Sequence, residues 1–257
     1  MKFFDTHAHI GLIHNDPIEE LIVIQQAKQA GVEHIVSICN SLHDFDEVYQ
    51  NLKTAKNIYH AVGISPSEVM HQGRNWESRI IENVKLDRVV AIGEIGLDYY
   101  RKFGDKDSQI ALFIRQLELA QQLNFPVIIH NRDAGADVLG ILHHRLPAKG
   151  GVLHCFSESY EYAKKAIDLG MYVSFAGNVT YKNAKNLHET ALNIPIENML
   201  IESEAPFMVP AAYKGKRNMP AYIHSTLEFI AELRGMDPEE CADILYKNSL
   251  RFFNIKE

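Results

Sequence analysis

The sequence has little cysteine, no long apolar run and no excess of positive charge, and each shortage excludes a class of protein. Its three cysteines are far apart and lack C-x-x-C spacing, which argues against a disulfide framework and suits a reducing compartment. The formal net charge of -7 excludes a whole-surface electrostatic attraction to nucleic acid or to an anionic membrane. No apolar run approaches the roughly 20 residues of a membrane span.

The start of the sequence also lacks an apparent targeting segment, because Met1 and Lys2 lead directly into an apolar run. We therefore expect a cytoplasmic protein with no membrane partner. Nothing in the composition implies an obligate protein partner.

Internal repeats, low-complexity segments and a glycine-rich dinucleotide-binding motif are absent as well. Apolar, β-rich runs instead alternate with longer amphipathic stretches. We predict strands over residues 2–9, 34–38, 58–63, 88–93, 125–130, 151–154, 171–175 and 199–202. We predict helices over residues 17–30, 41–55, 76–86, 107–123, 134–144, 159–169, 183–192, 220–234 and 238–252.

This alternation predicts an α/β fold. Mostly continuous apolar strands indicate burial on both faces, as in parallel sheets. Eight strand–helix units predict a single-domain (β/α)8 TIM barrel over residues 1–257. A doubly wound open sheet is the alternative, and the missing glycine-rich motif after the first strand disfavours it.

Two histidines mark the end of the first predicted strand. His7 and His9 are two residues apart, so their side chains point to the same face of a strand. Asp5 lies on that face too. Because neutral imidazole is a common metal ligand, this pair is a candidate metal site, although a lone His-x-His also occurs by chance.

Further potential ligands lie at the ends of later predicted strands: Glu94 and Asp98, then His130, His154, Glu202 and Glu204. In a (β/α)8 barrel the carboxyl ends of all strands meet on one face. These side chains together with the first two histidines suffice for two divalent ions that share a bridging carboxylate. Nitrogen and oxygen ligands suit Zn²⁺ or Mn²⁺, and less naturally Mg²⁺.

Each of these residues also has a purely structural interpretation. His130 and His154 could be hydrogen-bonded core histidines, and Asp98 could cap a turn. Arg217 belongs to a short basic run after the eighth strand, which could be an ordinary wet surface. At the mouth of a barrel, however, its guanidinium could bind a phosphate through two parallel hydrogen bonds.

Several motifs occur in order along residues 5–252: Asp5-Thr6-His7-Ala8-His9, Gly93-Glu94-Ile95-Gly96-Leu97-Asp98-Tyr99, Pro126-Val127-Ile128-Ile129-His130, His154-Cys155-Phe156 and Arg217-Asn218-x-Pro220. They resemble those of the TatD family of metal-dependent hydrolases. The resemblance implies a TIM barrel of the amidohydrolase superfamily and deoxyribonuclease activity of the exonuclease type. It further implies His7 and His9 as ligands of one metal, His130 and His154 as ligands of the other, and Glu94 as the bridging carboxylate.

The sequence departs from the family pattern at two positions. Glu204 stands where the family has Asp, in the segment Glu202-Ser203-Glu204-Ala205-Pro206, and the resemblance implies it as a metal ligand and general base. Ser65 stands where the family usually has a histidine that contacts substrate. We expect Ser65, Arg217 and Asn218 to bind substrate.

The resulting hypothesis is a hydrolase of DNA phosphodiester bonds that uses two divalent ions, with Glu94 and Glu204 as catalytic carboxylates. Three aromatic residues could stack on a base: Tyr99, Tyr181 and Phe207. One alternative is an enzyme of the same fold that acts on a small amide or ester. Another is a weakly active metal-binding protein, because of the changes at Ser65 and Glu204.

Overall fold

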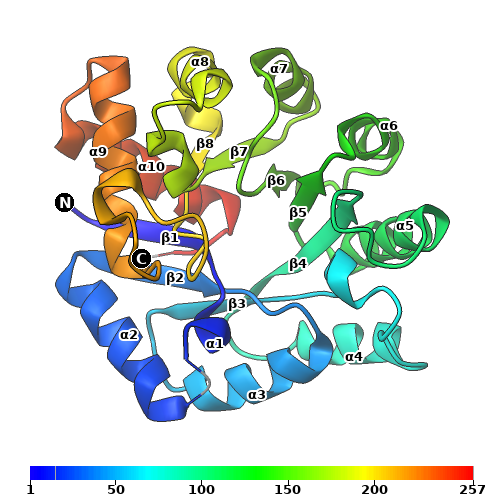
Figure 1. Cartoon of the computed structure of the whole chain (residues 1–257). Coiled ribbons are helices and arrows are strands. Elements are labelled where there is room, and N and C mark those ends of the chain that lie inside the picture. Colours follow the sequence, from blue (N-terminus) through cyan, green and yellow to red (C-terminus); the bar gives the residue numbers. More distant parts are fainter. Residues whose placement is uncertain (15, 257) are drawn as a thin grey trace.

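The computed structural model describes residues 1–14 and 16–256, and its eight strands form a ring with the helices outside (Figure 1). The strands are β1 (Phe3–Ala8), β2 (Val32–Ser37), β3 (Ile58–Val62), β4 (Val89–Asp98), β5 (Val127–Arg132), β6 (Gly151–Leu153), β7 (Tyr172–Phe175) and β8 (Met199–Ile201). They lie in sequence order, and each pairs in parallel with the next. The predicted (β/α)8 fold and all eight predicted strands are confirmed.

Hydrogen bonds between the first strand and the segment after β8 close the ring. The Glu204 amide donates to the His7 carbonyl at 2.9 Å, and the His9 amide donates to the Ala205 carbonyl at 2.8 Å. The Thr6 hydroxyl also donates to the Ile201 carbonyl, at 2.9 Å. The closure therefore places the first pair of predicted ligands directly beside Glu204.

Helices follow every strand. The α-helices are α1 (Ile10–Ile13), α2 (Pro17–Gln29), α3 (Leu42–Leu52), α4 (Trp76–Asn83), α5 (Lys106–Leu123), α6 (Gly135–Arg145), α7 (Tyr160–Asp168), α8 (Lys185–Asn193), α9 (Ile223–Arg234) and α10 (Pro238–Phe252). Short 3-10 helices are η1 (Pro66–Glu68), η2 (Gly177–Thr180), η3 (Ile196–Asn198), η4 (Ala211–Tyr213) and η5 (Pro220–Tyr222). The Asp16 carboxylate caps α2 by accepting from the amides of Ile18 and Glu19, as its place before Pro17 predicts.

Two features differ from the prediction. The short helices α1 and η1–η4 were missed, because three- or four-residue helices leave no periodic apolar pattern, whereas η5 and α9 together occupy the helix predicted over residues 220–234. Strand β4 also continues to Asp98, five residues beyond its predicted end. Gly96 makes this possible, since its φ is +144° and a Cβ there would lie 2.1 Å from the His130 carbonyl oxygen.

The barrel interior is filled from almost every strand. One buried cluster takes side chains from β1 to β6 and from β8, including Phe4, Ile128, Val152 and Leu200, and α10 contributes Tyr246. A larger cluster fills the space between strands and helices. Because side chains alternate along a strand, His130 and His154 follow Ile128 and Val152 onto the inner face. Within the described residues, we find no helix with the length and apolar character that crossing a membrane requires.

Candidate metal centre

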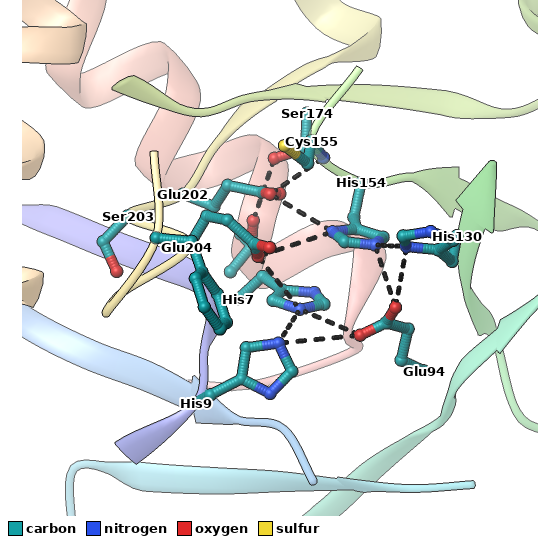
Figure 2. Close-up of polar contacts among 12 residues, drawn as sticks. His7, His9, Glu94, His130, His154, Cys155, Ser174, Glu202, Ser203 and Glu204 are labelled. Carbon is teal, nitrogen blue, oxygen red and sulfur yellow. Dashed lines mark hydrogen bonds and ion pairs between the residues drawn. The ribbon is translucent and has the colours of Figure 1, made fainter. Parts of the chain in front are cut away.

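The six predicted ligands meet at the carboxyl ends of the strands, where Figure 2 shows them converging on one region. They are His7, His9, Glu94, His130, His154 and Glu204. All are buried except His130, which is partly accessible. The structure therefore brings together the whole predicted ligand set from five strand ends.

Glu94 lies at the centre of this cluster and contacts four imidazoles. Its Oε2 lies 3.5 Å from His7 Nε2 and 3.6 Å from His9 Nε2. Its Oε1 lies 2.8 Å from His130 Nδ1 and 3.4 Å from His154 Nε2. Each carboxylate oxygen thus faces its own histidine pair, which is the arrangement that a carboxylate bridging two ions requires.

Glu204 completes one side of the cluster. Its Oε2 lies 3.3 Å from His7 Nε2 and 3.7 Å from His154 Nδ1. Its backbone has a positive φ of 56°, a conformation that is unusual for a non-glycine residue and that turns the side chain toward the histidines (Figure 2). The longer glutamate side chain therefore reaches the cluster from the position where the family has aspartate.

The donor set fits divalent cations. His7 Nε2 and His9 Nε2 lie 3.3 Å apart, and His130 Nδ1 and His154 Nε2 lie 3.1 Å apart, so only one proton can lie between the two nitrogens of each pair. Glu204 Oε2 is buried without a hydrogen-bond partner among the described residues. Buried polar atoms normally find partners, and a shared cation would supply them here. The ligand atoms of His7, His9 and Glu94 lie within 4.8 Å of one another. Those of Glu94, His130 and His154 do so as well.

Burial sets the protonation of the first histidine pair. It lowers the pKa of His7, and it lowers the pKa of His9 to about 3. Both imidazoles are therefore neutral near pH 7, as metal ligation requires. Burial also raises the pKa of Glu204 well above its usual value, whereas His154 and His130 overcome the effect of burial and hold the pKa of Glu94 well below it.

A carboxylate lies behind His130. Asp98 Oδ2 is 3.2 Å from His130 Nε2, and its Oδ1 accepts from the Arg101 amide at 2.8 Å. The Gln109 side chain holds the Asp98 backbone, accepting from its amide at 2.9 Å and donating to its carbonyl at 3.1 Å. The expected turn cap is confirmed, but sequence reasoning missed the second contact, by which Asp98 fixes the orientation of the imidazole.

Glu202 supports His154 in the same way. Its Oε1 lies 3.4 Å from His154 Nδ1 and accepts from the Cys155 amide at 2.8 Å. The sequence pointed to Glu202 only as one of the carboxylates at the end of the eighth strand, and the contact with His154 was missed. The place of Glu202 two residues before Glu204, with the same inward direction as Leu200, is the signal that could have found it.

The predicted substrate-binding residues lie in different places. Ser65 lines a cavity of about 400 Å³ that opens onto the cluster. Arg217 donates to the Leu12 carbonyl and lines a neighbouring cavity instead. Asn218 is buried and donates to the carbonyls of Ser203 and Phe207, so it shapes the segment that carries Glu204. The structure thus brings only Ser65 of these three to the cavity.

The three aromatic residues that could stack on a base also differ in their distance from the cavity: one lines it and two do not. Phe207 lines the cavity, is 48% exposed and lies 6.0 Å from the ring of His9. The Tyr99 hydroxyl donates to Asp137, at 2.8 Å, and the Tyr181 hydroxyl donates to the Val209 carbonyl, at 2.9 Å. Of these three residues, Phe207 is the one that lines the cavity.

The fold and this cluster define a class: a (β/α)8 barrel whose strand ends gather histidines and carboxylates for divalent metal ions. A family model described as TatD related DNase matches residues 4–254. The chain belongs to this family of metal-dependent hydrolases.

Individual relatives agree with this assignment. A Bacillus subtilis protein named "Uncharacterized metal-dependent hydrolase YabD" is 40% identical over 254 residues, covering 98% of this chain and 99% of the relative. A Salmonella typhimurium protein named "3'-5' ssDNA/RNA exonuclease TatD" is 31% identical, covering 91% of this chain and 92% of the relative. The crystal structure of YJJV, a TatD homologue from Escherichia coli, superposes with a TM-score of 0.91 at 29% identity, covering 99% of this chain and 98% of that one.

Proposed function

We propose that this protein hydrolyses phosphodiester bonds at the end of a DNA or RNA strand with the help of two divalent ions. The observation that carries the proposal is Glu94, whose two carboxylate oxygens each face a histidine pair. The name of the Salmonella relative, an exonuclease of single-stranded DNA and RNA, supports this substrate class.

Each histidine pair would hold one ion together with Glu94, and Glu204 would complete the ligands on the side of His7. Such ions supply charge stabilisation at the phosphoryl oxygens and acidify the attacking water. Asp98 and Glu202 hold His130 and His154 in place, which preserves the tautomer that leaves the ligating nitrogen free.

Glu204 is our candidate for the general base. Its Oε2 projects into the cluster without a hydrogen bond, and burial raises the pKa of its carboxyl group well above the usual value. A carboxylate that borders the ion beside His7 is placed to accept a proton, so Glu204 would take the proton of the attacking water.

The cavity favours a strand end as substrate. Its volume of about 400 Å³ lies in the lower part of the range for small-molecule sites, roughly 300–1,000 Å³. A space of this size accommodates a terminal nucleotide and excludes a duplex. Phe207 at the mouth is placed to contact the base of that nucleotide.

A nuclease assay with purified protein tests the proposal. End-labelled single-stranded DNA and RNA are incubated with Mn²⁺, Mg²⁺ or Zn²⁺, with and without excess chelator, and the products are resolved by length. We expect metal-dependent release of single nucleotides, lost in Glu94→Gln. Cleavage that persists in chelator would contradict the mechanism, and turnover of small amides or esters without any nuclease activity would contradict the substrate class.

A further inference from the structure

The cavity beside the metal centre has a second charged feature on the wall formed by β4 and β5. Arg132 is the last residue of β5, and it pairs in register with Asp98 at the end of β4. Arg101 follows three residues after Asp98, and both arginines line the cavity. Of the described residues that line it, these two are the only lysines or arginines.

Neither guanidinium has a carboxylate partner within ion-pair distance in residues 1–14 and 16–256. This sets them apart from other arginines of the chain, since Arg79, Arg115 and Arg145 each form ion pairs of 2.5–2.7 Å. Arg132 is partly buried and Arg101 is exposed, so both guanidinium groups are accessible to a ligand in the cavity. The cavity therefore holds two cations that are free to bind an anion.

Arg132 is also held in one orientation. Its guanidinium lies over the ring of Tyr100, 4.0 Å from the ring centroid, in a cation–π contact. Its carbonyl accepts from the Tyr99 amide at 2.9 Å, which fixes the backbone. Restraint of this kind reduces the entropy lost when the guanidinium binds a ligand.

We infer that Arg101 and Arg132 form an anion subsite that binds the phosphate group next to the scissile phosphate of the substrate. This inference rests on the proposed function and deepens it. Guanidinium groups match the paired oxygens of a phosphate, and the subsite lies on the His130 side of the metal centre. It replaces the phosphate contact that the sequence suggested for Arg217, whose guanidinium donates to the Leu12 carbonyl.

Kinetics of Arg132→Met, Arg101→Met and Arg132→Lys test the subsite. The substrates are a single-stranded oligonucleotide and bis(p-nitrophenyl) phosphate, which has no neighbouring phosphate. For the oligonucleotide we expect each methionine variant to raise KM about tenfold, the effect of one charge-assisted hydrogen bond, with kcat changed less than twofold. Arg132→Lys should recover part of the loss. For bis(p-nitrophenyl) phosphate both constants should stay unchanged.

A modified substrate makes the test specific to one phosphate. Replacing the linkage next to the terminal one by a neutral methylphosphonate should raise the KM of the wild type more than tenfold and the KM of Arg132→Met by a smaller factor, because the variant has already lost one of the two arginine contacts. Arg145→Met is the matched control. This arginine pairs with Glu118 at the surface, at the end of α6, and its loss should affect neither substrate.

The outcomes separate this inference from the proposed function. Equal effects of Arg132→Met on both substrates, or an undiminished methylphosphonate penalty in that variant, would overturn the subsite while phosphodiester hydrolysis stands. If the wild type cleaves neither substrate, calorimetric titration of the metal-loaded protein with inorganic phosphate decides. Binding about tenfold weaker in Arg132→Met would support the subsite, and equal binding would overturn it.

Discussion

Shortening Glu204 to aspartate gives the sharpest test of how the site works. In Glu204→Asp the side chain matches the family pattern, so a comparison of sequences alone would favour equal or higher activity. The structure predicts the opposite, because the glutamate carboxylate already lies 3.3 Å from His7 Nε2 and 3.7 Å from His154 Nδ1.

The backbone of this segment has little freedom to follow a shorter side chain. The Glu204 amide donates to the His7 carbonyl at 2.9 Å, and its carbonyl accepts from the Phe207 amide at 2.8 Å. The Ala205 carbonyl also accepts from the His9 amide at 2.8 Å. The carboxylate would therefore withdraw by about 1.5 Å, the length of one carbon–carbon bond.

A displacement of this size at a catalytic group costs about 100-fold in rate, which corresponds to about 2.7 kcal/mol of transition-state stabilisation. We expect kcat/KM of Glu204→Asp to fall by that factor on single-stranded DNA at saturating metal. Glu228→Asp, on the exposed face of α9, is the control and should be unaffected. Equal or higher kcat/KM in Glu204→Asp would refute the reasoning and indicate that the natural protein is impaired.

Three further predictions follow from other parts of the molecule. Removing metal with a chelator should lower the unfolding temperature in calorimetry, since an ion present at 100 times its Kd contributes about 2.7 kcal/mol, and an unchanged temperature would contradict a resident ion. Asp98→Asn should weaken metal binding about 10- to 100-fold in calorimetric titration of the metal-free protein, because His130 loses its orienting carboxylate, and unchanged affinity would contradict that role. Burial lowers the pKa of His60 from 6.5 to about 4, because the folded protein disfavours the charged imidazole. The neutral His60 side chain therefore contributes fully to the unfolding free energy above pH 6.5, and this contribution is lost as the pH falls through 4. Between pH 7 and pH 4 the wild type should lose about 3 kcal/mol more of its unfolding free energy than His60→Leu in urea titrations, and parallel pH dependences would contradict this.

The strands and long helices were predictable from local patterns, whereas the extended end of β4 was not. Strand β5 begins as a continuous apolar run, residues 127–129, that leads directly to His130, and Asp16 before Pro17 is a typical helix start. The continuation of β4 past Gly93 depends on a tertiary contact, the close approach of Gly96 to the His130 carbonyl. Such a contact leaves no trace in the hydrophobic periodicity of the strand.

The candidate ligands were predictable because their types recur at strand ends, and a barrel brings strand ends together. The residues that orient these ligands, and the arginines that line the cavity beside them, were harder to predict from the sequence. Asp98 matches a turn-capping pattern and makes both kinds of contact. Arg217 belongs to the basic run that the sequence singled out, but the cations at the cavity are Arg101 and Arg132, from the corner between β4 and β5.

Anomalous X-ray diffraction from crystals grown with Mn²⁺ or Zn²⁺ tests the central claim most directly. We predict two anomalous peaks on either side of the Glu94 carboxylate, one beside His7 and His9 and the other beside His130 and His154. Metal peaks elsewhere in the molecule, with none beside Glu94 at saturating metal, would contradict the account.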